Sequence, residues 1–214
     1  MSAITKPQCD RYPHLLLLLL VPVYLWSVIH PADGFTWVLE MFRVVIGVCV
    51  LVPTFNRFRL THLTYTLIWI HAAVLLVGAH YTYAGVPLFD WIRDSLDLSR
   101  NHYDRVGHFV QGFVPVMIAR EVLIRTSPLK SSKWLCVIVV SICLAFSAVY
   151  ELVEWGVAGL SGTAAEAFLG TQGDVWDTQK DMALCLVGSI VSLPLLSRWH
   201  DKQLLKIFPA ETAD

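Results

Sequence analysis

Apolar stretches long enough to cross a membrane recur along the chain, separated by short polar segments. An α-helix needs roughly 20 mostly apolar residues to span the hydrocarbon core of a bilayer. Six stretches meet this condition, at residues 12–30, 35–55, 62–81, 107–125, 134–154 and 175–197. The pattern therefore predicts an all-α integral membrane protein, in which residues 1–214 form a single domain built as a bundle of six transmembrane helices.

Two of the connecting segments carry patterns of their own. In residues 86–100, the apolar Phe89, Ile92 and Leu96 are spaced i, i+3, i+7, and charged residues occupy the other faces. This spacing predicts a short interfacial helix between the third and fourth spans, either a lid over the bundle or a membrane anchor. The small residues of segment 159–170 favour a re-entrant turn that lines a cavity.

The composition supports a membrane protein and excludes several other classes. Hydrophobic residues make up 56% of the chain and charged residues only 15%, which is typical of integral membrane proteins. The net charge of −1 provides no basic surface for nucleic acid. The five cysteines form no CxxC pair, and we interpret them as small hydrophobic residues. The chain has no GxSxG motif of serine hydrolases and no phosphate-binding GxxxxGKS/T loop.

The charged residues predict an orientation and mark one face of the membrane. Basic residues accumulate in the short cytoplasmic loops of membrane proteins. If both termini are cytoplasmic, 11 of the 16 basic residues fall on the cytoplasmic side, so we predict an N-in, C-in topology. The acidic residues show the opposite bias, with 12 of 17 placed outside or in the outer half of the membrane. Because acidic residues barely affect insertion, this excess indicates that the outer face needs carboxylates for another purpose.

Four segments are expected to bring polar side chains to this outer face. The first, at the end of the third span, carries His80, and the other three carry several candidates each. The candidates lie on single helical stripes at the outer ends of the fourth, fifth and sixth spans: Asp104, His108 and Gln111 (i, i+4, i+7), Glu151 and Glu154 (i, i+3), and Asp174, Asp177 and Asp181 (i, i+3, i+7). Asp181 lies about two turns into its span, which is deep for an acid that only faces water.

Carboxylates packed this closely near lipid require compensation. Like charges one turn apart repel each other, and loss of water favours the neutral form. Three remedies are open: basic side chains such as Arg105, Lys180 and Arg43, shared protons, or a divalent metal ion. The expected metal ligands are the carboxylates and one imidazole of Asp104, His108, Glu151, Glu154, Asp174, Asp177 and Asp181. The predicted catalytic residues are Asp104, Arg105, His108 and Asp181.

Structural roles are the alternative for several polar residues. Asp is favoured at helix N-termini, so Asp174 alone is typical of a helix cap. Glu40 and Arg43 form either a structural ion pair or a site in which Arg43 holds an anionic substrate group. His71, in the middle of the third span, is expected to be packed and hydrogen-bonded, and His200 at the cytoplasmic edge is given no role. The other polar candidates are His80, His102, Gln111 and Gln172.

Three segments carry a family resemblance. Residues 101–115 (NHYDRVGHFVQGFVP), 150–155 (YELVEW) and 170–182 (GTQGDVWDTQKDM) resemble the YjdF-like family of uncharacterised bacterial inner-membrane proteins. The resemblance extends over nearly the whole chain. It implies a multi-pass protein of the bacterial inner membrane, and it implies no particular chemistry.

Three functions are consistent with these patterns, and we favour the first. It is an outer-facing, metal-dependent enzyme acting on a lipid or envelope molecule, in which Arg105 binds a phosphate or carboxylate and a metal-bound water is the nucleophile. The second is a proton-coupled transporter or channel with Glu151 and Asp181 as protonation sites. The third is a structural or assembly protein whose acids bind a basic loop of another subunit. The expected partners are membrane lipids, and no nucleic acid.

Overall fold

The computed structural model describes residues 11–161 and 169–207, in which helices are joined by short connecting segments and no strand occurs. The helices, in chain order, are α1 (Tyr12–Val28), α2 (Gly34–Thr54), α3 (His62–Tyr81), α4 (Pro87–Ser95), α5 (Tyr103–Phe113), α6 (Pro115–Thr126), α7 (Lys133–Ser161) and α9 (Asp177–Ile207). All six apolar stretches predicted from the sequence are therefore helical, as is the predicted short helix between the third and fourth.

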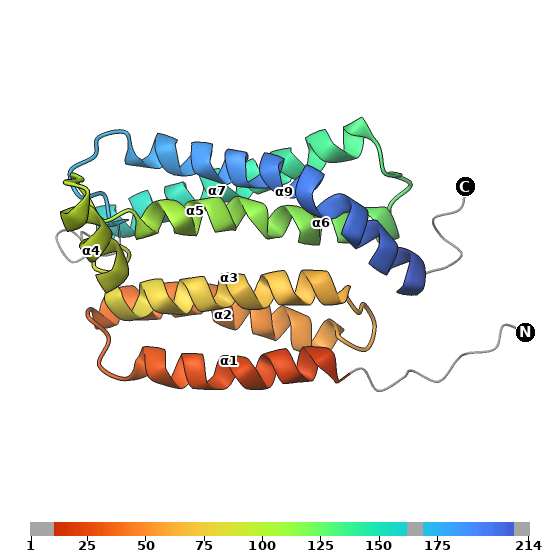
Figure 1. Cartoon of the computed structure of the whole chain (residues 1–214), viewed down its shortest axis with the longest axis horizontal. Helices are drawn as coiled ribbons and strands as arrows, with labels where there is room; N and C mark the ends of the chain where they lie inside the picture. The colour runs from red at the N-terminus through yellow and green to blue at the C-terminus, as the bar shows by residue number, and fades with distance from the viewer. Residues whose placement is uncertain (1–10, 162–168, 208–214) are drawn as a thin grey trace, which may run out of the picture.

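The long helices lie side by side, and the short α4 is placed across one end of the bundle (Figure 1). Helix α3 packs against α1 and α2, while α9 packs against α5 and α7. Contacts of α3 with α5, α6 and α9 join these two halves. Helix α1 begins and α9 ends at the end of the bundle opposite α4 (Figure 1). We call the two ends the α4 end and the opposite end.

Five helical segments are long and apolar enough to cross a membrane. They are α2, α3, the α5–α6 pair at Tyr103–Thr126, α7, and α9. Helix α1 is equally apolar in character but has 17 residues, and it falls among the shorter helices. The predicted class, an all-α membrane protein with several spans, is confirmed at this level.

The bounds of three spans differ from those predicted. The fifth, predicted to end at residue 154, continues seven residues further to Ser161. The fourth begins at Tyr103 rather than residue 107 and is divided at Val114, because Pro115 cannot donate a backbone hydrogen bond and instead starts α6. The last continues past residue 197 to Ile207. The polar residues after residue 197 are typical of a helix end. The helix nevertheless continues, because the buried side chains of His200 and Leu204 pack this part of α9 against the bundle.

The structure bears on the apolar stripe predicted for the segment that forms α4, but hardly on the turn predicted between the last two spans. Helix α4 presents Phe89 to the bundle, where its ring packs edge-on against Tyr103 at a centroid distance of 5.3 Å. Leu96, which the predicted stripe placed on the same face as Phe89, is 66% exposed and lies just after the helix, which ends at Ser95. The predicted re-entrant turn in segment 159–170 lies mainly outside the described residues.

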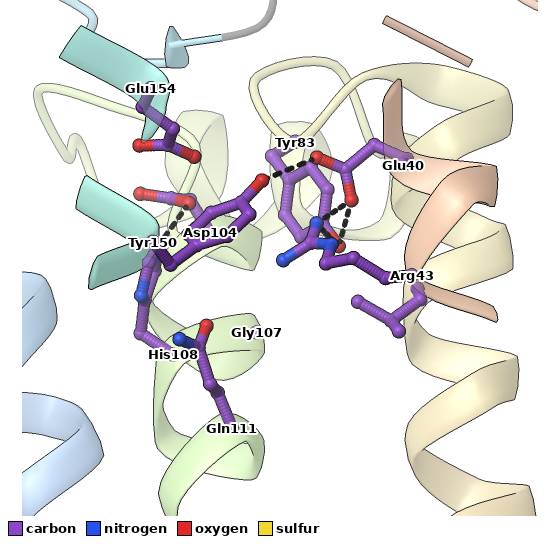
Figure 2. A pocket seen from close by; sticks show the side chains of 10 residues that line it. Glu40, Arg43, Tyr83, Asp104, Gly107, His108, Gln111, Tyr150 and Glu154 are labelled. Atoms are coloured by element: carbon purple, nitrogen blue, oxygen red, sulfur yellow. Dashed lines mark hydrogen bonds and ion pairs between the residues drawn. The ribbon is translucent and has the colours of Figure 1, made fainter. Parts of the chain in front are cut away.

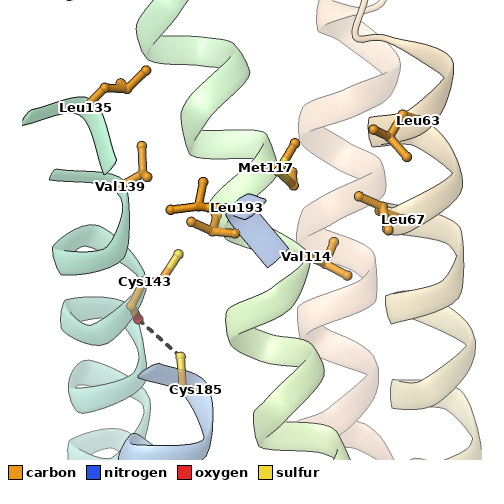
Figure 3. Close-up of a cluster of buried hydrophobic side chains, with 10 residues drawn as sticks. Leu63, Leu67, Val114, Met117, Leu135, Val139, Cys143, Cys185 and Leu193 are labelled. Atoms are coloured by element: carbon orange, nitrogen blue, oxygen red, sulfur yellow. Dashed lines mark hydrogen bonds between the residues drawn. The ribbon is translucent and has the colours of Figure 1, made fainter. Parts of the chain in front are cut away.

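An apolar cluster fills the middle of the bundle between α3, α6, α7 and α9 (Figure 3). Its buried members include Leu67, Met117, Val139 and Leu193. Two of the cysteines, Cys143 and Cys185, are buried in this cluster, in keeping with their interpretation as small hydrophobic residues. The cluster separates the polar side chains of the α4 end from those of the opposite end.

Two glycines allow α5 and α9 to approach closely. A β-carbon at Gly112 would overlap the backbone carbonyl of Cys185, and one at Gly188 would overlap that of Phe109. Small residues at such crossings let membrane helices pack backbone against backbone. This contact brings the polar beginnings of α5 and α9 together at the α4 end.

Candidate functional site

Three buried side chains converge where α5 and α9 begin. Asp104 and His108 come from α5 and Asp181 from α9, and each is less than 10% exposed. One ligand atom from each of the three lies within 4.8 Å of the others. The Nε2 atom of His108 is 3.4 Å from Asp104 Oδ1 and 3.8 Å from Asp181 Oδ2. We call these residues the His–Asp–Asp triad.

Helix α7 adds two glutamates beside the triad. The Oε1 atom of Glu151 lies 3.8 Å from His108 Nδ1, and neither of these buried atoms has a hydrogen-bond partner among the described residues. Glu154 lines a cavity of about 10 Å³ together with Asp104 and His108 (Figure 2). That volume holds about one water molecule. The triad with Glu151, Glu154, Asp174 and Asp177 is called the acidic cluster below.

Two arginines compensate part of this negative charge. Arg100 donates to Asp177 Oδ1 at 2.5 Å, to Asp104 Oδ2 at 3.2 Å and to the carbonyl of Gly170 at 3.1 Å. Arg105 donates to Asp177 Oδ1 at 2.5 Å and forms an ion pair with Asp181. Basic side chains, one of the three remedies considered from the sequence, are therefore present.

The importance of Arg100 was missed in the sequence. The signal available was its spacing, because Arg100 and Asp104 are an i, i+4 pair of opposite charge. Both Nη atoms of Arg105 are engaged by α9 carboxylates, so in this structure Arg105 positions those acids and has no Nη free for a substrate.

The compensation is incomplete among the described residues. The acidic cluster has six carboxylates and is paired with three permanent cations, Arg100, Arg105 and Lys180. Even a protonated His108 would leave negative charge in excess. Excess charge of this kind cannot remain buried unless it takes up protons or a further cation.

Asp174 lies at the rim of the cluster. Its Oδ2 atom is 2.6 Å from Lys180 Nζ and 3.0 Å from Arg105 Nη2, and its Oδ1 accepts from the backbone N–H of Trp176 at 3.1 Å. These contacts, with Lys180 the largest, hold the pKa of Asp174 below its usual value. Helix α9 begins three residues later, so Asp174 stabilises the turn before the helix.

Glu40 and Arg43 form the ion pair considered from the sequence, and two tyrosines complete it (Figure 2). Tyr83 donates to Glu40 at 3.1 Å, Tyr150 donates to Glu40 at 3.3 Å, and the Arg43 guanidinium lies 4.3 Å from the centre of the Tyr150 ring. Burial raises the pKa of Tyr83 well above its ordinary value. Neither tyrosine was singled out in the sequence, because only the fold brings them to Glu40.

Several predicted polar candidates serve elsewhere. His80 Nδ1 is 3.2 Å from the carbonyl of Ser27 and its ring packs on Trp26, which ties α3 to α1. The amide of Gln172 pairs with the backbone of Asn101 through two hydrogen bonds of 2.9 and 3.0 Å. Both residues therefore have structural partners outside the acidic cluster.

The side chains of the remaining candidates make no hydrogen bond among the described residues. His102 immediately precedes α5, and burial together with Arg100 and Arg105 lowers its pKa. Gln111 lines the small cavity one turn beyond His108. His71, expected to be hydrogen-bonded, instead lines an apolar groove.

A second buried polar cluster lies at the opposite end. Glu121 accepts from the backbone N–H of Thr61 at 2.8 Å and from the hydroxyl of Thr64 at 2.7 Å. It also pairs with Arg125 at 3.1 Å and with His200 Nε2 at 3.0 Å. His200, given no role from the sequence, is fully buried here. Because Glu121 has several close partners, this cluster is a structural joint between α3, α6 and α9.

A bundle of long apolar helices with a buried polar site at one end defines a multi-pass integral membrane protein. Residues 12–202 match the family described as "Predicted membrane protein (DUF2238)", and the chain belongs to this family. It is similar to the inner membrane protein YjdF of Escherichia coli (strain K12), with 45% identity over 187 residues that cover 87% of this chain and 90% of that protein. No solved structure matches the chain.

The family confirms the resemblance seen in the sequence motifs. It also confirms the predicted location, because both the family and the similar E. coli protein are described as membrane proteins. The protein is therefore a multi-pass protein of the bacterial inner membrane. Neither description names an activity, so the function has to be argued from the site.

Proposed function

We propose that the protein is a metal-dependent enzyme that acts on a lipid or envelope molecule at the outer face of the inner membrane. The observation that carries this proposal is the His–Asp–Asp triad, whose buried ligand atoms lie within 4.8 Å of one another. Ligand bonds of about 2.0–2.2 Å place the donor atoms on one ion roughly 3–3.5 Å apart. Small side-chain rotations therefore suffice for Asp104, His108 and Asp181 to share one divalent ion.

The surrounding residues have matching roles. Glu151 faces the second ring nitrogen of His108, where a carboxylate fixes the orientation of a metal-bound imidazole. Arg100 and Arg105 hold Asp104, Asp177 and Asp181 in place from the opposite side. A metal ion here would neutralise the excess negative charge and activate a bound water as the nucleophile.

The proposal includes an orientation. Helix α1, with 17 residues, is at the lower end of the length that crosses a bilayer, and we count it as the sixth span. With both termini in the cytoplasm, the α4 end faces outward. Leu88 and Trp91 of α4 are more than 60% exposed, and these apolar side chains suit a helix lying in the membrane interface.

The arrangement favours an enzyme over the two alternatives. A proton-coupled transporter needs a polar route across the membrane. In the described residues the apolar cluster around Met117 and Leu193 lies between the acidic cluster and Glu121. An assembly role would leave the acids available to a partner, whereas most of them are buried and paired with Arg100 and Arg105.

The test is the metal content of the purified protein. The chain is purified with a histidine-free affinity tag, loaded with zinc or manganese, desalted and measured by mass spectrometry. We expect about one ion per chain, and a loss of at least about tenfold in affinity in His108→Gln and Asp181→Asn. Asp94→Asn, at an exposed acid of α4, is the matched control and should bind like the wild type.

Absence of stoichiometric metal from monodisperse wild-type protein would rule the proposal out. Equal binding by Asp181→Asn and Asp94→Asn would also contradict it, because the ion would then sit outside the triad.

A further inference from the structure

A long apolar groove runs beside the site. It has a volume of about 760 Å³, within the range of small-molecule binding sites. Its walls come from α1, α2, α3, α5, α6 and α7, and they include Leu17, Val48, Leu51, Ile68, Ile118 and Phe146. All of these residues belong to helices that lie in the membrane, so the groove is available to the hydrocarbon chains of lipids.

The groove ends at the acidic cluster. It shares Arg43, Leu75, Gln111 and Tyr150 with the small cavity lined by Asp104 and His108, which Figure 2 shows from close by. Along α2 it extends from Arg43 to Phe55, about 18 Å at 1.5 Å per residue. One leaflet of the hydrocarbon core is about 15 Å thick, so the groove accommodates a single extended acyl chain.

Unpaired polar atoms distinguish this groove from a surface that merely faces lipid. The Arg43 Nε and Trp69 Nε1 atoms are buried without a hydrogen-bond partner among the described residues, and both residues line the groove. The ring of His71, which also lines it, is likewise without a hydrogen bond there. Unpaired donors in an apolar environment are costly, so the occupant should bring acceptor oxygens.

These acceptors are needed at the end of the groove that lies nearest the acidic cluster. Met41 and Val44 of α2 pack in one cluster with Ala72 and Leu75 of α3. Because α2 and α3 run in opposite directions (Figure 1), His71 lies near the level of Arg43, and Trp69 lies further from the acidic cluster. A glycerophospholipid has this order of groups, with a phosphate first, ester carbonyls next and then hydrocarbon.

We propose that the groove binds one acyl chain of a phospholipid and presents its phosphate to the His–Asp–Asp triad. The ester oxygens accept from Trp69 and His71, and the phosphate lies beside Arg43. This inference rests on the proposed function and names its substrate class, a phospholipid that enters from within the membrane.

The test uses phospholipids with brominated acyl chains, which quench nearby tryptophan fluorescence. Phosphatidylglycerol and diacylglycerol with the same brominated chains are titrated into the protein in detergent. A variant that keeps Trp69 and carries phenylalanine in place of the other seven tryptophans isolates the signal of Trp69. We expect saturable quenching of this signal, with half-saturation at an at least tenfold lower mole fraction for phosphatidylglycerol than for diacylglycerol.

A pair of glycine variants makes the test specific to the groove. Gly47 lines the groove, and a β-carbon there meets no atom within 4 Å, so Gly47→Leu fills the groove without disturbing the backbone. Gly156 of α7 is equally open and does not line the groove, so Gly156→Leu is the matched control. We expect Gly47→Leu to abolish saturable quenching and Gly156→Leu to retain it.

Metal content measured on the same samples separates this inference from the proposed function. Equal quenching in the two glycine variants, or equal titrations with the two lipids, overturns the phospholipid site even if the protein binds one metal ion. Quenching lost only in Gly47→Leu supports the phospholipid site. If the wild-type protein then binds no metal, the proposed enzyme fails and the lipid site stands.

Discussion

At the residue scale, Arg100 and Arg105 determine how the acidic cluster is held. Each guanidinium has several donors in a fixed plane, and each reaches more than one carboxylate. The Oδ1 atom of Asp177 accepts from both arginines and therefore links them. The arginines contact Asp104 Oδ2 and Asp181 Oδ1, which leaves Asp104 Oδ1 and Asp181 Oδ2 facing His108.

We predict that Arg100→Gln destabilises the protein strongly. Removing one partner of a buried ion pair leaves the other charge uncompensated, which costs about 3–5 kcal/mol. Arg93→Gln is the matched control, because Arg93 pairs with Asp90 and Asp94 on the exposed surface of α4. Thermal unfolding in detergent should show a clear decrease of the melting temperature for Arg100→Gln and little change for Arg93→Gln. Similar melting temperatures for the two variants would contradict the role given to Arg100.

At the element scale, the site depends on how closely α5 and α9 pack. Gly112 and Gly188 place the two backbones in direct contact, and the polar first turns of the same helices then face each other. Helix α7 contributes Glu151 and Glu154 through its packing against α9. The triad is thus a consequence of a helix crossing about one to two turns away from it.

We predict that Gly188→Val separates α5 from α9 and abolishes metal binding. The added side chain would overlap the carbonyl of Phe109, and relieving such a clash costs about 1–3 kcal/mol or more. Gly156→Val is the control, because a β-carbon at Gly156 meets no atom within 4 Å. Metal content and melting temperature should both decrease in Gly188→Val only. A Gly188→Val protein that keeps full metal content would show that the crossing does not position the triad.

The sequence predicted the existence of the helices better than their ends. Long apolar runs are local signals, so all six stretches were found. The extension of α9 to Ile207 depends on the packing of His200 and Leu204, and the early start of α5 depends on the contacts of Tyr103. Such tertiary contacts outweigh the local polar residues that normally indicate a helix end.

At the scale of the whole molecule, two buried polar clusters lie at opposite ends of an apolar core. The cluster around Glu121 has its polar groups well paired, whereas the acidic cluster retains unpaired atoms on His108 and Glu151. Buried polar groups without partners are rare in stable proteins. This difference is why we assign structure to one end and chemistry to the other.

The candidate site was partly accessible from the sequence. Helical spacing placed Asp104 with His108 and Asp177 with Asp181, and the structure brings these stripes together. Spacing could not reveal that Tyr83 and Tyr150 converge on Glu40, because they come from separate parts of the chain. It also could not show that His80 and Gln172 are occupied by Ser27 and Asn101.

The orientation of the whole molecule is testable with single cysteines. Ser95→Cys introduces an exposed thiol at the last residue of α4, and Lys133→Cys introduces one at the opposite end. With an N-in, C-in topology, a membrane-impermeant maleimide should label Ser95→Cys in intact cells with a permeabilised outer membrane. Lys133→Cys should react only after the inner membrane is broken. The wild type provides the background, and the reverse labelling order would place the acidic cluster in the cytoplasm.

Diffraction can show directly whether a metal ion binds at the His–Asp–Asp triad. Crystals grown with zinc are measured at the zinc absorption edge, and an anomalous difference map is calculated. We expect a peak about 2.0–2.3 Å from ligand atoms of Asp104, His108 and Asp181. A map from well-ordered crystals with no peak at the triad, or with zinc bound only elsewhere, would contradict this expectation.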